Sequence, residues 1–129
     1  MPYPLAPAGC FRLAEISIFI FFAGCVWVSH QRDRRRLAYL VGGFAFGVLL
    51  ERVGVSTGYC SYGRFYFMLG HAPYHVPLCV GAAWGSIIYS SRLFSDSLHL
   101  PVFAAAALDA LLALNIDLSM DVVAYRLHM

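Results

Sequence analysis

The stretch that decides the fold is PVFAAAALDALLALNIDLSMDVVAYRLHM, which runs from Pro101 to Met129. It is long and apolar enough to enter a bilayer, yet it carries Asp109, Asp117 and Asp121. An acidic side chain inside a membrane span costs roughly 2.5 to 3.5 kcal/mol on insertion scales, and such residues usually mark functional positions. We therefore expect these three acids to have a chemical role.

The composition indicates a protein surrounded by lipid. Hydrophobic residues make up 60% of the 129 residues, charged residues make up 12%, and the mean hydropathy is +0.69. A helix needs about 20 apolar residues to cross a bilayer. The sequence therefore predicts an all-α, integral membrane bundle of about four transmembrane helices that forms a single domain over residues 1–129. The four predicted spans are Leu13–His30, Leu37–Val55, Val76–Phe94 and Leu100–Leu118.

The basic residues indicate an orientation in the membrane rather than a nucleic-acid partner. The chain contains no lysine, and its formal net charge is only +2. Arg32 and the run Arg34–Arg36 crowd the connection between the first two predicted spans. Because arginine-rich loops tend to stay on the cytoplasmic side, we expect this loop to be cytoplasmic and the N-terminus and the loop over residues 56–75 to lie outside.

Cysteine and histidine spacing gives no metal or redox motif. His71 and His75 are four residues apart, but Pro73 between them argues against the regular helix on which such a pair can share a metal. No two cysteines form a Cys-x-x-Cys pair, and we expect no disulfide, no metal and no organic cofactor. The cysteines are Cys10, Cys25, Cys60 and Cys79.

The loop between the second and third predicted spans is rich in aromatic residues. It follows the run ERVGVSTG, which begins at Glu51, and it has five aromatic residues within nine positions. Two interpretations stay open: an aromatic belt at the lipid headgroups, or the mouth of a site for a lipid-like substrate. Trp84 in the third predicted span is likewise either a packing residue or a flat ring that can stabilise a cation. The five aromatic residues are Tyr59, Tyr62, Phe65, Tyr66 and Phe67.

The three acids of the last predicted span share one broad helix face. At about 100 degrees per residue, Asp117 lies about 80 degrees and Asp121 about 120 degrees round the helix from Asp109. Asp117 and Asp121 are one turn apart, so ionising both is unfavourable and one is expected to keep a proton that it can donate. The alternative is structural: Asp117 and Asp121 end the helix in water, and Asp109 bonds to a neighbouring helix.

Four short motifs in order resemble a known family. They are ERVGVSTGYCSYGRFYF, then LG, then HVPLCVGAAW, then NIDLSMD. Together they cover roughly Leu50 to Tyr125, and the chain is similar to the carotenoid-biosynthesis membrane protein family that includes the carotenoid 1,2-hydratases of the CruF type. The positions that match the family motifs are Glu51, Gly54, Thr57, Gly58, Tyr62, Gly63, Pro77, Trp84, Asp117 and Asp121.

The resemblance implies a multi-span protein that adds water across a terminal C=C bond of an acyclic or monocyclic carotenoid, giving a tertiary alcohol without a cofactor. It also implies a bacterial or archaeal cytoplasmic membrane. Our hypothesis makes the Asp117/Asp121 pair the proton donor and its partner, with Glu51 or Asp109 orienting the water. Trp84 with Tyr62 or Tyr66 would face the cation. The remaining expected substrate-binding residues are Gly58, Thr57 and Pro77.

The chain also departs from the family pattern. Val122 stands where the family tends to have proline, and Cys60-Ser61 stand where Pro-Phe is expected. The sequence ends at Met129, where the family usually continues with an aromatic pair and further spans. We therefore expect a fragment or a shortened relative.

Two other functions stay open. Asn115-x-Asp117-x-x-x-Asp121 faintly resembles the magnesium-diphosphate motif of membrane prenyltransferases, in which carboxylates bind a hard cation. A non-enzymatic bundle that binds a carotenoid, or that associates with a larger complex, would use its acids only for hydrogen bonds between helices. The expected partners are a long-chain carotenoid or isoprenoid and membrane lipid, with a second copy of the chain or carotenoid-pathway enzymes as further candidates.

Overall fold

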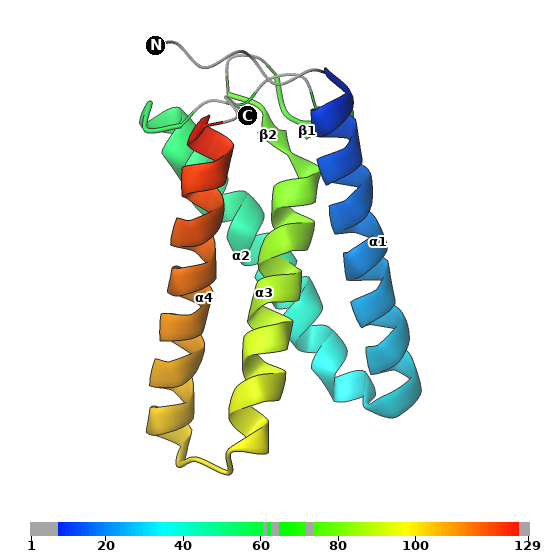
Figure 1. Cartoon of the computed structure of the whole chain (residues 1–129), viewed down its shortest axis with the longest axis vertical. Helices are drawn as coiled ribbons and strands as arrows, with labels where there is room; N and C mark the ends of the chain where they lie inside the picture. Colours follow the sequence, from blue (N-terminus) through cyan, green and yellow to red (C-terminus); the bar gives the residue numbers. More distant parts are fainter. Residues whose placement is uncertain (1–7, 61, 63–64, 72–73, 127–129) are drawn as a thin grey trace.

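The computed structural model describes residues 8–60, 62, 65–71 and 74–126, and these form four helices and a short hairpin (Figure 1). Helix α1 spans Ala8–Arg32, α2 spans Leu37–Ser56, α3 spans Leu78–Ser97 and α4 spans Val102–Arg126. The short 3-10 helix η1, Arg34–Arg36, joins α1 to α2. Strands β1, Met68–Leu69, and β2, Val76–Pro77, lie between α2 and α3. The predicted four helices are confirmed.

Three of the described helices are long and apolar enough to cross a membrane. These segments are Gly9–Arg32, Arg34–Ser56 and Val102–Val123. Helix α3 is not among them. Of the four predicted spans, three are therefore long and apolar enough in the described residues to cross a membrane. Two residues of the predicted third span, Val76 and Pro77, form β2 instead. Proline disfavours the helical conformation in the residue before it, and Pro77 is itself extended at the N-cap of α3.

Helix α3 is the centre of the bundle, with α2 behind it and α1 and α4 on its two sides (Figure 1). It is less apolar than its neighbours because other helices cover it. Its buried residues are mostly small or polar, and include Gly81, Ala82, Gly85, Ser86, Ser91 and Ser95. Small residues let helices approach closely in a membrane protein.

The α2–α3 contact depends on glycines from both helices. A Cβ atom on Gly43 would lie 2.8 Å from the Gly85 Cα, and one on Gly85 would lie 2.7 Å from the Leu40 carbonyl oxygen. A Cβ on Gly47 would overlap the Trp84 side chain. Gly43 and Gly47 therefore allow the close approach of α2 to α3.

The two ends of the bundle differ. The α1–α2 and α3–α4 turns lie at one end, and the β1–β2 segment lies at the other, near the beginning of α1 and the end of α4 (Figure 1). Strands β1 and β2 pair antiparallel, with Met68 opposite Pro77. The Leu78 N–H donates to the Phe67 carbonyl at 2.9 Å, which holds the loop against the first turn of α3. We call these the turn end and the loop end.

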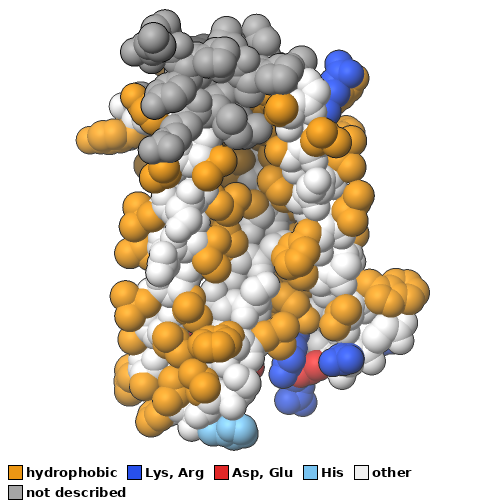
Figure 2. All heavy atoms as spheres, in the orientation of Figure 1, with side chains coloured by type: hydrophobic (Ala, Val, Ile, Leu, Met, Phe, Trp, Pro, Cys, Tyr) orange, Lys and Arg blue, Asp and Glu red, His pale blue; other side chains and the backbone are white. Residues whose placement is uncertain are grey.

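The surface between the two ends is apolar. Large hydrophobic side chains are exposed along the helices, and on the face in Figure 2 the charged side chains lie near the two ends. Trp27 is 68% exposed and Phe103 is 91% exposed. Contiguous exposed apolar surface of this kind is compatible with a membrane protein.

Candidate functional site

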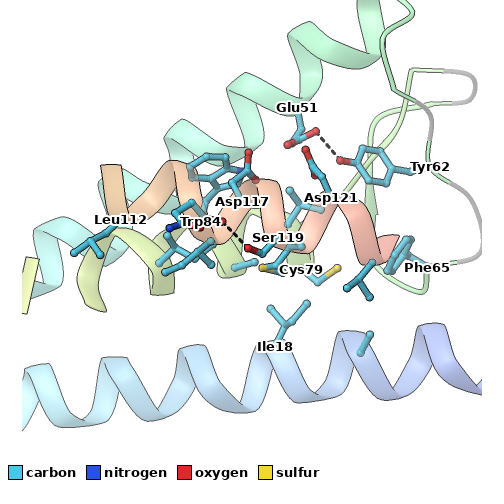
Figure 3. Close-up of a pocket in the computed structure, with 18 residues that line it drawn as sticks. Ile18, Glu51, Tyr62, Phe65, Cys79, Trp84, Leu112, Asp117, Ser119 and Asp121 are labelled. Carbon is cyan, nitrogen blue, oxygen red and sulfur yellow. Dashed lines mark hydrogen bonds between the residues drawn. The ribbon is translucent and has the colours of Figure 1, made fainter. Parts of the chain in front are cut away.

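A cavity of about 770 Å³ lies at the loop end, between α1 and α4 and against α3. Helix α2 contributes Glu51 to its wall, the loop contributes Tyr62 and Phe65, and α3 contributes Trp84 (Figure 3). The other side chains of the wall are mostly apolar. From α4 come the polar residues Asn115, Asp117, Ser119 and Asp121.

A second cavity of about 490 Å³ continues the first along the bundle. It is lined by α1, α3 and α4, and its residues include Ser17, Phe21 and Ser90. Both cavities are open to the surface rather than enclosed, so they form one apolar groove with its acidic residues at the loop end. The residues that line both are Ile18, Ala83, Ile87, Ile116 and Met120.

Glu51 accepts hydrogen bonds from two side chains of the loop. The Tyr62 hydroxyl donates to Glu51 Oε2 at 2.6 Å, and the Cys60 thiol donates to the same oxygen at 3.7 Å. The Asp121 carboxyl lies on the facing side, directed toward Glu51 (Figure 3). The site therefore joins α2, α4 and the loop through side chains that the sequence keeps far apart.

The loop groups of this cluster have altered acidities. The pKa of Tyr62 is raised by burial first, then by its hydrogen bond to Glu51 and by the negative charges of Glu51 and Asp121. The pKa of the Cys60 thiol is raised by burial and by Glu51, with a smaller effect of Asp121. Both groups therefore stay protonated and act as hydrogen-bond donors toward Glu51.

Asp117 and Asp121 lie one turn apart on α4, and both line the cavity together with Trp84. The Trp84 side chain is 9% exposed, and its ring packs edge-on against Phe46 with ring centres 5.5 Å apart. None of the ion pairs found among the described residues includes Asp117, Asp121 or Glu51. The structure thus brings together five of the expected residues, Glu51, Tyr62, Trp84, Asp117 and Asp121.

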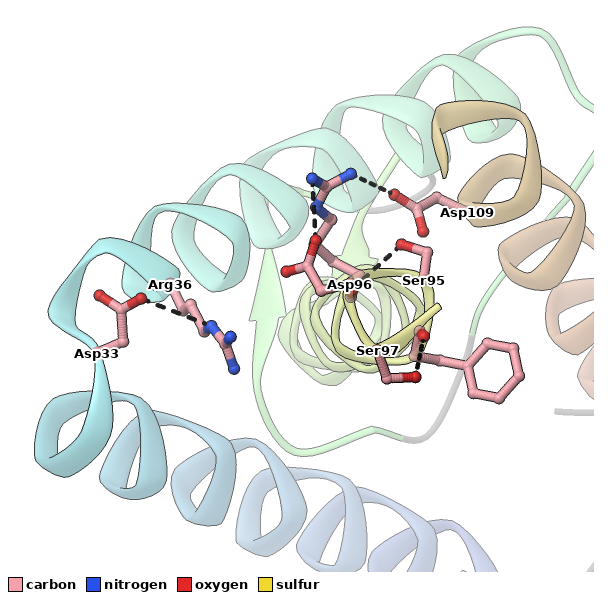
Figure 4. Close-up of polar contacts among 8 residues, drawn as sticks. Asp33, Arg36, Ser95, Asp96, Ser97 and Asp109 are labelled. Carbon is pink, nitrogen blue, oxygen red and sulfur yellow. Dashed lines mark hydrogen bonds and ion pairs between the residues drawn. The ribbon is translucent and has the colours of Figure 1, made fainter. Parts of the chain in front are cut away.

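Asp109 lies elsewhere, in a cluster near the turn end (Figure 4). Its Oδ2 accepts from Arg92 Nη1 at 3.3 Å, and Arg92 Nη2 lies 3.0 Å from Asp96 Oδ1. The Arg92 guanidinium also lies over the Tyr39 ring, 5.9 Å from its centre. The structure does not bring Asp109 to the cavity, because its carboxyl is bound to the neighbouring helix, as in the structural alternative.

Four other expected substrate-binding residues do not line the cavity. Tyr66 is 66% exposed, and the Arg12 guanidinium lies over its ring at 5.1 Å. Thr57 caps α2, with its hydroxyl donating to the Val53 carbonyl at 2.8 Å. Gly58 follows with a φ of 80°, a left-handed conformation that favours glycine. Pro77 is buried just before α3, so all four shape the loop rather than the wall.

Sequence reasoning missed several residues that the site contains. Phe65 takes the wall position expected of Tyr66, and Cys60 adds a donor to Glu51. Beside the site, on α1, Glu15 is 3% exposed and accepts two backbone N–H groups from the loop. A signal existed for Glu15: an acid within an apolar run needs a partner inside the protein.

Other expectations concern metals, thiols and the loop. No group of three His, Cys, Asp or Glu residues among those described lies close enough together to hold a metal ion. Cys10, Cys25, Cys60 and Cys79 are free thiols. Of the aromatic loop, Tyr59, Tyr62, Phe65, Tyr66 and Phe67 lie within the described residues, whereas the matching position Gly63 lies outside them.

No protein-family model, curated protein or solved structure matches this chain. The resemblance to the carotenoid hydratases therefore depends on the four sequence motifs.

Proposed function

We propose that this chain is an integral membrane protein that adds water to a terminal C=C bond of a long acyclic or monocyclic carotenoid. The observation that supports this most is the groove, in which an apolar channel ends at Glu51, Asp117 and Asp121 beside the Trp84 ring. An apolar polyene chain fits the channel, and its reactive end would lie among the acids. Such chemistry needs a proton donor and a bound water, and the side chains of the cavity can provide both.

The reaction begins with a carboxylic acid of the Asp117/Asp121 pair. The π electrons of the terminal double bond take its proton to form a C–H bond at the chain carbon, leaving a tertiary cation at the carbon that bears two methyl groups. The faces of Trp84 and Phe65 stabilise this cation. The positions of these rings in the cavity wall support this role.

A water held by Glu51 completes the reaction. Its oxygen lone pair forms the C–O bond and gives a protonated alcohol. This alcohol loses a proton to the carboxylate of the Asp117/Asp121 pair, so the pair regains its proton. The net change is the addition of one water. The hydrogen bond from Tyr62 fixes Glu51 for this task. Hydrogen-bonded positioning of an acid or base contributes strongly to proton transfer.

The proposal includes a placement in the membrane. Helices α1, α2 and α4 face lipid, α3 is their shared centre, and Arg32 and Arg34–Arg36 hold the turn end on the cytoplasmic side of a bacterial or archaeal membrane. The cavity and the aromatic loop then lie toward the outer side. Because the groove opens between α1 and α4, a carotenoid can enter from the lipid without passing through water.

Pigment analysis tests the proposal. The chain is expressed in a lycopene-producing bacterium, and tertiary alcohol products are expected in the wild type. D117N and D121N should each lower product formation at least about 100-fold, the lower range for removing a general acid. The matched control D109N also removes an acid from α4, but its carboxyl is bound to Arg92, so product should persist. Full activity in D117N and D121N would refute the assignment.

A second candidate is a non-enzymatic carotenoid-binding protein, which the apolar and laterally open groove also favours. It predicts that unmodified carotenoid copurifies with the wild type and with D117N and D121N alike, and that no alcohol forms. Association with a second copy or with carotenoid-pathway enzymes fits either candidate.

A further inference from the structure

Glu15 is a buried carboxylate outside the proposed chemistry. It lies on α1, it is 3% exposed, and no ion pair among the described residues includes it. A buried charge without hydrogen bonds is very unfavourable. Glu15 obtains them from the loop: Oε2 accepts the Tyr66 N–H and Oε1 accepts the Phe67 N–H, both at 3.0 Å. Charge-assisted bonds to two successive amides fix the path of the backbone.

Two aromatic rings on the same face of α1 add further contacts between α1 and the loop. Phe11 and Phe19 lie four residues before and after Glu15, so the three side chains form one stripe along the helix. The Phe11 ring packs edge-on against Phe65 at 5.5 Å, and the Phe19 ring packs edge-on against Phe67 at 6.0 Å. The stripe therefore holds the segment from residue 65 to residue 67 at both ends and in the middle.

The segment that Glu15 holds leads directly to the catalytic cluster. Phe65 lines the cavity, and its ring packs against Tyr62 with centres 6.4 Å apart. Tyr62 in turn donates to Glu51. Contacts therefore run from α1 through Phe65 to the hydrogen bond that orients Glu51.

We propose that Glu15 is a positioning residue: its carboxylate fixes the loop segment as the wall that closes the cavity at the loop end, and thereby holds Tyr62 on Glu51. The effect on turnover rests on the proposed hydration, whereas the effect on the cavity does not. Glu15 itself touches neither substrate nor water in this role.

The test uses E15Q and E15A in the chain of 129 residues, with D109N as the matched control at the turn end. E15Q keeps the shape of the side chain but can accept only one of the two N–H groups. The rate of hydration per folded molecule, kcat, should fall roughly tenfold in E15Q and further in E15A, the scale of one lost hydrogen bond to a charged group. KM should rise as well, because the same segment forms part of the cavity wall, and D109N should keep the wild-type kcat and KM.

A binding measurement separates this proposal from the proposed function. In a W27F background, Trp84 is the remaining tryptophan, and quenching of its fluorescence by all-trans-retinol reports an apolar ligand in the cavity. Retinol affinity should fall roughly tenfold in E15A and be unchanged in D109N.

Each outcome has one meaning. If the wild type makes no alcohol but retinol affinity falls in the Glu15 variants, the hydration proposal fails and the positioning role stands. If hydration occurs and both kcat and retinol affinity are unchanged in E15Q and E15A, the positioning role is overturned. If E15A does not accumulate, the same comparison is made with E15Q, and a normal kcat there overturns the proposal.

Discussion

The two polar clusters of the bundle both contain carboxylate side chains, but the partners of these carboxylates differ. At the turn end, Asp109 and Asp96 share the Arg92 guanidinium, so each of these carboxylates has a cationic partner within the protein. At the loop end, Glu51 is bonded by a phenol and a thiol, which are neutral donors, and Asp121 faces it across a cavity. Asp109 and Asp121 lie on the same helix, and what distinguishes them is the partner across the interface.

The comparison teaches that an acid in an apolar helix is informative only together with its partner. A carboxylate paired with a guanidinium holds a stable charge and contributes to helix contact. A carboxyl group that lies beside other acids around a cavity is more readily protonated, and the cavity gives it room for a ligand. Adding a guanidinium to the loop-end cluster, or removing the one at the turn end, should therefore change what the carboxylates of that cluster do.

The largest expected effect comes from adding a guanidinium to the loop-end cluster. In S119R the new side chain starts from a residue that lines the cavity with Asp117 and Asp121. It should pair with these acids and remove the donatable proton, lowering alcohol formation at least about 100-fold. Pigment analysis measures the product. S119M, of similar bulk and without charge, should keep more of the activity, and equal losses in the two variants would point to blocked space instead of charge.

A smaller effect is expected from removing the guanidinium of the turn-end cluster. R92M leaves Asp109 and Asp96 without their shared partner, and the Asp109 side chain is only 24% exposed. The free energy of unfolding should fall by about 2 kcal/mol, less than for a fully buried pair because water reaches both groups. Denaturation in detergent measures it. The double variant R92M/D109L should recover most of the loss, and its failure to do so would show that the stem of Arg92, not the charge pair, matters.

The smallest expected effect is alkaline sensitivity at the loop end. Because the folded-state pKa of Tyr62 is raised, the unfolded chain releases this proton first as pH increases. The contribution of Tyr62 to the free energy of unfolding is therefore fully present below about pH 10, the ordinary pKa of tyrosine. Above that pH the free energy of unfolding falls by no more than about 1.4 kcal/mol per pH unit. Melting curves at rising pH measure this slope. In Y62F the slope should be shallower by that amount, and an unchanged slope would show that Tyr62 is not the responsible group.

The helices and part of the site could be predicted from the sequence because local patterns determine them. Apolar length located the helices, and acids at helical spacing on the last span located Asp117 and Asp121. The partner of Asp109 could not be predicted, since Arg92 reaches it only through the α3–α4 packing. For a similar reason the sequence pointed to Tyr66 where the structure has Phe65 in the cavity wall. These are neighbouring residues of an irregular loop, and no local pattern indicates which of the two side chains faces the cavity.

The serine-rich centre of the bundle has a consequence for how the protein is made. The Ser86 hydroxyl donates to the Ala82 carbonyl at 2.9 Å and the Ser95 hydroxyl to the Arg92 carbonyl at 3.2 Å, so α3 partly satisfies its own polar groups. Its limited apolarity still makes it a poor substrate for the insertion machinery by itself. In the proposed membrane placement, α3 should therefore enter the bilayer together with α4 as a hairpin, and the cavity at the loop end should assemble only after α4 has been translated.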